Sequence, residues 1–205
     1  MLGVKLRFIL PLLLAATCVA QAANDPKAAR FYEDALSRYE KKDLKGAIIE
    51  LKNALQVDKD MLPVQLLLGR VLMADGQPNQ AEVAFTEALR LGVSRAEVVV
   101  DLAQSLIDQG KQQVLVTDPR FVSSGLPAGI QLKLTLLKAS AAADVGNVRE
   151  SYRLIEQARA LNPADPDTHL AEVALRIRER RFDAAIAAAD KAAALAPGAA
   201  GSLYQ

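Results

Sequence analysis

The sequence predicts an all-α solenoid built from about five helix-turn-helix repeats. Small residues recur 34 positions apart, as in the series Ala35, Gly69 and Ala103 and in the pair Ala47 and Ala81. A fixed interval of this length, with small residues where two helices touch, is typical of stacked helix pairs. Alanine is abundant and tryptophan is absent, which suits close helix packing and a high helix content.

The first two repeats are predicted at residues 28–61 and 62–95. In the first, Phe31 and Ala35 lie on one face of a helix, and Lys42-Asp43 separates it from a second amphipathic helix. In the second, Gly76 marks the turn between the helices, and Gly92 ends the second helix.

The third repeat, residues 96–131, is predicted to be irregular. Its first helix runs regularly to Gly110, but Pro119, Gly125 and Pro127 then interrupt the sequence. Prolines and a glycine at this density exclude a long continuous helix. We therefore expect a shortened second helix and a segment, Val114–Gln131, that is more mobile than its neighbours.

The periodicity resumes in repeats at residues 132–165 and 166–199. Asn162-Pro163 ends the former, and Ala196-Pro197-Gly198 ends the latter. Residues 200–205 resemble the opening of a further first helix. The expectation from this ending is a chain that belongs to a longer repeat array.

Residues 1–22 have the pattern of a secretory signal peptide. Lys5 and Arg7 precede the apolar run Phe8–Val19, which is shorter than the roughly 20 residues that span a bilayer. Ala20-Gln21-Ala22 then supplies small residues for cleavage. The prediction is an exported, periplasmic protein whose mature chain begins at Ala23.

Cys18 is the only cysteine, so it has no partner for an intramolecular disulfide. Two interpretations stay open. Cys18 is either removed with the signal peptide or lipidated, in which case it anchors the protein to a membrane. The preceding Leu14-Ala15-Ala16-Thr17 is a poor lipidation site, which favours simple cleavage.

The charge balance and the residue types argue against several functions. Basic and acidic side chains number 25 and 24, so the dense positive field that nucleic-acid binding requires is missing. His169 is the only histidine and is expected to be structural, since a metal site needs further ligands. No catalytic constellation is evident, so we expect a non-enzymatic protein without cofactors or metals.

The repeats resemble tetratricopeptide repeats. Asp43–Leu51 followed by Ala54-Leu55 matches the second-helix motif of that family, and Leu68-Gly69 and Asn162-Pro163 match its first-helix and terminal signatures. The resemblance implies a right-handed superhelix that binds protein or peptide partners. Departures include Lys42 and Arg180, which stand where glycine is usual.

A narrower resemblance concerns the string at residues 47–56, together with Leu66–Arg70 and Ala81-Glu82. These residues are similar to the tetratricopeptide lipoproteins of bacterial PEP-CTERM/exosortase and exopolysaccharide systems. This resemblance implies a scaffold in the cell envelope that supports protein sorting or exopolysaccharide secretion.

Family analogy places one face of the first helices on the concave side. Its candidate partner-binding residues are Tyr32, Tyr39, Leu66, Arg70, Met73, Gln104 and Ile107. The chemistry of this groove suits an extended or helical peptide. The alternative is that its apolar members only pack between neighbouring repeats.

A second candidate surface is the basic cluster Arg176, Arg178, Arg180 and Arg181, interrupted by Glu179. Such a cluster suggests a glycan- or peptidoglycan-associated binding module of the periplasm as the alternative function. A solvated helix end is the simpler interpretation of the same charges.

Overall fold

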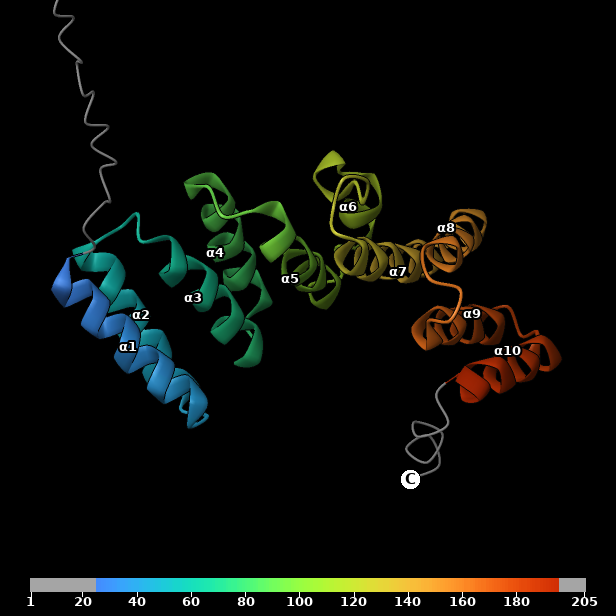
Figure 1. Cartoon of the computed structure of the whole chain (residues 1–205), viewed down its shortest axis with the longest axis horizontal. Helices are drawn as coiled ribbons and strands as arrows, with labels where there is room; N and C mark the ends of the chain where they lie inside the picture. Colours follow the sequence, from blue (N-terminus) through green and yellow to red (C-terminus); the bar gives the residue numbers. More distant parts are fainter. Residues whose placement is uncertain (1–24, 196–205) are drawn as a thin grey trace, which may run out of the picture.

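The computed structural model describes residues 25–195, which form ten α-helices and one 3-10 helix and no β-strand (Figure 1). The helices are α1 (Pro26–Glu40), α2 (Leu44–Val57), α3 (Leu62–Ala74), α4 (Pro78–Leu91), α5 (Arg95–Asp108), α6 (Gln112–Thr117), η1 (Pro119–Phe121), α7 (Ala128–Asp144), α8 (Val148–Leu161), α9 (Pro166–Arg178) and α10 (Phe182–Leu195). They follow one another as antiparallel pairs along a curved array, so the predicted all-α solenoid is confirmed.

Local sequence signals start these helices where the periodicity requires it. The Asp43 carboxylate accepts a hydrogen bond from the amide of Gly46 at 3.0 Å and so caps α2. Asn147 and Asp165 cap α8 and α9 in the same way. Pro26 and Pro166 lie in first turns, where a missing amide donor is not needed.

The turns within the helix pairs use left-handed backbone. Gly76, Gly110 and Gly146 adopt positive φ at equivalent positions, and Lys42 and Arg180 adopt φ of 62° and 60° at the two positions without glycine. A residue with a Cβ is strained in this region. The geometry of the repeat thus overrides the local preference of these two side chains.

Small residues close each helix pair, as the sequence predicts. Ala47, Ala81 and Ala88 are completely buried. Gly69 lies directly against the ring of Phe85, which is itself fully buried. These contacts allow the paired helices to approach closely, and they confirm the assignment of the helix hairpins.

The third repeat has the shortened second helix that its prolines predict. α6 has six residues and is followed by η1 of three residues, which buries Phe121. The Arg95 guanidinium donates to the carbonyl of Val122 at 2.8 Å and ties this segment to α5. Its mobility stays a prediction.

The start of the fourth repeat is corrected by the structure. We expected the boundary at Leu132, but α7 begins at Ala128, with Pro127 as its N-cap residue. Proline has a φ suited to this position and cannot continue a helix from the preceding segment. The first helix of this repeat is therefore four residues longer at its start than the periodicity indicates.

The buried core consists of two apolar clusters that meet at α7. Leu134 and Ala141 of α7 belong to the larger cluster, which includes α1–α6. Ala139 and Ala142 belong to the smaller one, with Ile155 of α8 and Leu175 of α9. α7 therefore connects the first three repeats to the last two.

The expected signal peptide at residues 1–22, Cys18 and the start of a further repeat at 200–205 lie outside the described residues, as do residues 196–199 of the fifth repeat. Within residues 25–195, no helix combines the length and the apolar character that crossing a membrane requires.

Candidate functional site

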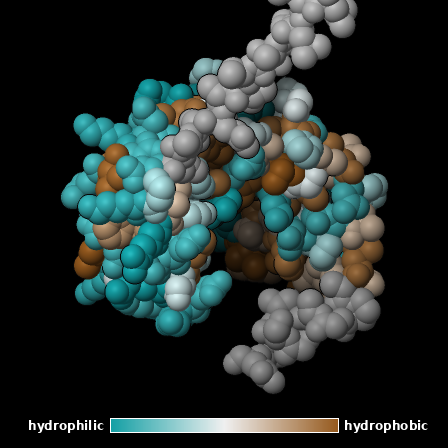
Figure 2. Space-filling model, turned by 60° about the vertical axis from the view of Figure 1, so that its left-hand side comes forward, coloured by the Kyte–Doolittle hydropathy of each residue, from teal (hydrophilic) through white to brown (hydrophobic). Residues whose placement is uncertain are grey.

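The first helices of the repeats line the inner side of the curve. Contacts join α3 to α5, α5 to α7 and α7 to α9, whereas the second helices of successive repeats make no comparable contacts among the described residues. Helices that are closer to one another must lie on the inside of a bend. Figure 2 shows a hollow in the middle of the molecule with hydrophobic residues at its base.

Three rows of equivalent side chains run along these first helices, and we call this surface the inner face. Equivalent residues lie 34 positions apart, or 36 across the irregular third repeat. The first row is Tyr32, Leu66, Val100, Leu136 and Leu170. The central row is Leu36, Arg70, Gln104, Ser140 and Ala174, and the third row is Tyr39, Met73, Ile107, Ala143 and Ile177. The first and third rows are apolar in every repeat. The central row is apolar only in the first repeat, at Leu36, and has polar or small residues in the later repeats.

The seven predicted groove residues all lie in these rows. Their apolar members are partly buried and pack against the core, so they combine a structural contact with an accessible surface. The packing interpretation therefore holds for these side chains, and the binding interpretation stays a prediction. Large amphipathic groups such as Tyr39 and Met73, accessible on one side, are typical of interface positions.

Arg70 connects two repeats across the inner face. Its Nε lies 2.9 Å from the Asp101 carboxylate of α5, and its guanidinium also donates to the carbonyl of Glu97 at 3.2 Å. Gln104 donates to Asp108 at 2.7 Å. These contacts hold the polar heads of the central row in fixed positions, so the inner face presents a preorganised surface.

Leu170 and Ile177 extend the inner face into the fifth repeat and are absent from the predicted set. They are 38% and 51% exposed, more than the equivalent residues of the preceding repeats. The signal that identifies them is the periodicity itself, because they continue the first and third rows. The end of the inner face at α9 is thus its most exposed apolar part.

The predicted basic cluster does not form one surface. Arg176 and Arg178 are engaged between the fourth and fifth repeats, whereas Arg180 and Arg181 lie exposed in the turn before α10. Arg178 pairs with Asp144 of α7 at 2.5 Å. The sequence places the four arginines together, but their partners on α7 and α9 separate them.

The junction between the fourth and fifth repeats is held by charged side chains. Glu172 accepts from Arg159 of α8 at 2.7 Å and from Arg176 at 3.1 Å. The Arg176 guanidinium also lies 4.7 Å from the ring centre of Tyr152, within the range of a cation–π contact. Burial, and then the hydrogen bond to Glu179, raise the pKa of Tyr152.

Apolar residues hold the equivalent positions at the earlier junctions. Leu68 and Leu102 stand where Glu172 stands, and Leu72 and Leu106 stand where Arg176 stands. All four leucines are buried. The last junction therefore relies on paired charges where the first two rely on apolar packing.

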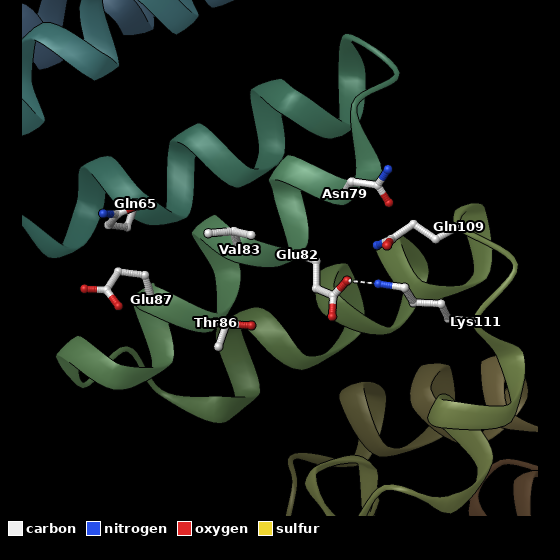
Figure 3. A pocket seen from close by; sticks show the side chains of 8 residues that line it. All are labelled: Gln65, Asn79, Glu82, Val83, Thr86, Glu87, Gln109 and Lys111. Carbon is white, nitrogen blue, oxygen red and sulfur yellow. Dashed lines mark hydrogen bonds and ion pairs between the residues drawn. The ribbon is translucent and has the colours of Figure 1, made fainter.

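An open depression lies beside α4, away from the inner face (Figure 3). It has a volume of about 630 Å³ and is open, and Val83 and Thr86 are exposed along its wall. Its Glu82 and Lys111 pair with each other at 2.7 Å, as the dashed line in Figure 3 marks. These charges are already satisfied by one another, so the depression offers little to an ionic ligand.

Among the described residues, no three histidine, cysteine, aspartate or glutamate side chains come together as a metal site would require. His169 is buried between helices, which agrees with the structural role expected of it. The inner face therefore stays a candidate binding surface, and the absence of catalysis stays a prediction.

A solenoid of helix pairs with a continuous inner face defines an α-helical repeat protein. A family model of the tetratricopeptide repeat matches residues 38–92, which run from the end of α1 to the end of α4. Residues 38–92 are thus similar to tetratricopeptide repeats, and the other described helix pairs continue the same solenoid fold. A search of curated proteins found no match to the sequence.

Several solved structures share this architecture. MamA from Desulfovibrio magneticus RS-1 superposes with a TM-score of 0.72 at 16% identity, over 84% of this chain and 97% of its own. YrrB, described as a TPR protein with an unusual peptide-binding site, has a TM-score of 0.62 at 16% identity, over 86% and 90%. Pseudomonas aeruginosa PilF has a TM-score of 0.59 at 17% identity, over 83% and 77%. At these identities the likeness shows a common fold.

Proposed function

We propose that the chain is a non-enzymatic interaction scaffold that binds a segment of a partner protein along the inner face. The observation that carries this proposal is the continuity of the two apolar rows across five repeats, from Tyr32 and Tyr39 to Leu170 and Ile177. A groove with apolar anchoring positions and a polar centre suits an extended or helical peptide.

The preorganised central row supports the same function. Arg70 is 46% exposed in its side chain although it pairs with Asp101, so it has donor capacity for a peptide carbonyl or carboxylate. YrrB, which has the same fold, is a TPR protein with an unusual peptide-binding site, and this supports a peptide-binding surface here.

We further propose that the scaffold acts in the bacterial cell envelope. The support is the signal-peptide pattern of residues 1–22 and the similarity of residues 47–56 to the tetratricopeptide proteins of exosortase and exopolysaccharide systems. Intact mass spectrometry of the exported protein tests the location. An N-terminus at Ala23 supports a periplasmic protein, and a diacylglycerol-modified Cys18 supports a membrane anchor.

The peptide-binding role is tested by replacing Tyr39, Arg70 and Met73 together with alanine. Truncation of an interface anchor commonly costs about 2 kcal/mol of binding. The triple variant should therefore lose the peptides that the unaltered chain selects from a phage-displayed dodecapeptide library, while its helical circular dichroism stays close to that of the unaltered chain.

The matched control replaces Ile49 and Val83 with alanine. These residues are 58% and 70% exposed at equivalent positions of α2 and α4, outside the inner face. This variant should retain peptide binding. Equal loss in both variants, or undiminished binding by the triple variant, would argue against the inner face as the site.

The glycan-binding alternative receives less support. It requires a concentrated positive surface, but Arg176 and Arg178 already pair with Glu172 and Asp144. Arg180 and Arg181 alone form a weak anion-binding site on an exposed turn, because dissolved ions screen exposed surface charges.

A further inference from the structure

A cavity of about 80 Å³ lies between α7, α8 and α9. Its floor is formed by Ala139, Ile155 and Leu175, all of which are almost completely buried. Its mouth is formed by the exposed residues Ser140, Ala174 and Arg178. We call this cavity the socket.

The socket opens on the inner face. Ser140 and Ala174 are members of the central row, and Ala143 of the third row lies in its wall. The charged junction of the fourth and fifth repeats lies at its side, since Arg178 at the mouth pairs with Asp144. A segment that follows the inner face would pass directly over the opening.

The socket exists because side chains are small here. Ala143 occupies the position of Met73 and Ile107, and Ala171 occupies the position of Leu67. The equivalent pairs at the three earlier junctions are Tyr39 with the buried Leu67, Met73 with Asp101, and Ile107 with Leu137, and every one of these side chains is larger than alanine. Because several side chains around this point are shorter than their equivalents in other repeats, they leave a space between the helices. Close packing in a protein interior normally leaves no such space.

We propose that the socket binds one branched aliphatic side chain, of valine, isoleucine or leucine, from a peptide seated on the inner face. The proposal rests on the proposed peptide-binding function and names the anchor that this function uses. The side chain would supply the volume that Ala143 and Ala171 lack compared with Tyr39 and Leu67 at the junction of the first and second repeats.

Volume favours an aliphatic occupant over an aromatic one. An apolar cavity of about 150 Å³ accommodates benzene, and the socket has about half that volume. A branched side chain with three or four carbon atoms matches this space better than a phenyl or indole ring does.

Polarity excludes a charged or hydrogen-bonding occupant. Ser151 in the wall already donates to the carbonyl of Ala139 at 2.8 Å. Arg178 donates to the carbonyl of Ala143 at 3.3 Å and to Asp144 at 2.5 Å. A polar side chain placed on the floor would find at most the acceptor oxygen of the Ser151 hydroxyl and would lose its hydration.

The first test uses xenon and does not depend on any peptide. Methyl NMR spectra of the protein under xenon pressure should show shifts at Ala139, Ala143 and Leu175, because xenon enters apolar cavities. Ala143→Met should fill the socket and abolish these shifts. Ala187→Met, a substitution at an exposed position of α10, should leave them unchanged. Absence of the shifts in the unaltered protein would overturn the proposal.

The second test uses a dodecapeptide selected by phage display for binding to the protein. Each of its positions is replaced in turn by alanine, leucine and phenylalanine. One position should bind at least tenfold more tightly with leucine than with either alanine or phenylalanine. Ala143→Met should remove that preference, and Ala187→Met should keep it.

The two tests separate the two proposals. Xenon shifts with no selectable peptide would contradict the peptide-binding function, and with it a peptide as the source of the side chain. In another outcome, xenon shifts and peptide binding are both observed, but no peptide position shows a leucine preference that Ala143→Met removes. This outcome would contradict the socket as an anchor site and would leave the inner face as a binding surface.

Discussion

Gly69 of α3 lies against the ring of Phe85 of α4, and this close contact is possible only because glycine has no side chain. A Cβ at Gly69 would lie 2.4 Å from Cε1 of the Phe85 ring, and that ring is completely buried. No ordinary carbon–carbon contact is this short. The glycine therefore determines how closely α3 and α4 pack.

Gly69→Ala should destabilise the protein, although alanine is the better helix former by about 1 kcal/mol. Overpacking of a full core costs about 1–3 kcal/mol, and it exceeds the gain in helix propensity when the aromatic ring has no space to move. Gly129→Ala is the control, since its added Cβ meets nothing within 4 Å. Urea denaturation should give a lower midpoint for the first variant and an equal or higher one for the second.

Glu172→Ala should loosen the fifth repeat. The change leaves Arg159 and Arg176 without their shared carboxylate in a partly buried junction, and hydrogen bonds to charged groups are worth about 1.5–3 kcal/mol. Hydrogen exchange of the α9 and α10 amides should accelerate relative to those of α3 and α4.

Glu156→Ala is the matched control for this junction. Glu156 also pairs with Arg159 but is 64% exposed in its side chain, and exposed ion pairs contribute about 0–1 kcal/mol. Exchange rates should barely change in this variant. Equal effects of the two substitutions would show that the junction does not rely on Glu172.

Arg180→Gly should stabilise the protein by about 1 kcal/mol. Arg180 adopts a φ of 60°, and a left-handed residue with a Cβ costs about 1–2 kcal/mol, which glycine avoids. Arg181→Gly, one residue later, removes the same charge without relieving such strain, so it should destabilise. Thermal melts of the two variants should move in opposite directions, and a parallel decrease would show that the turn is not strained.

Acid should weaken the irregular third repeat through Asp118. Its hydrogen bond to the Arg120 side chain, followed by the Arg120 amide, lowers the pKa of Asp118 below its ordinary value of 3.8. A carboxylate with a depressed pKa stabilises the fold above that ordinary value, and the contribution is lost as pH falls through the lowered pKa.

Asp118→Asn should therefore be less stable than the unaltered protein at pH 6, and the difference should shrink below about pH 4. Denaturation at a series of pH values measures this difference. A constant difference across the series would exclude the protonation of Asp118 as a cause of acid sensitivity.

The fold was predictable because the repeat imposes several coincident constraints. Packing of the two helices of a pair against each other requires Ala47 and Ala81 to be buried, and both are completely buried. Pro119 and Pro127 had to interrupt a helix, and α6 is short. The start of α7 was not predictable from periodicity, because Pro127 begins the helix ahead of the point where the apolar pattern resumes.

The site was predictable only in part. The register of the first helices places Tyr39, Arg70 and Met73 on one face, and the same register extends to Ile177. The pairing of Arg178 with Asp144 depends on how two repeats stack, which a local run of arginines does not reveal. The socket likewise results from the combined shortness of side chains on three helices.

Site-specific photo-crosslinking in cells can detect whether partners bind the inner face. A photoreactive phenylalanine analogue is placed at Tyr39, Met73 or Ile107 on the inner face, and at Ile49 or Val83 outside it. We expect cross-linked partner bands from the three inner positions and none from the outer two. Cross-links from Ile49 or Val83, with none from the inner positions, would contradict this expectation.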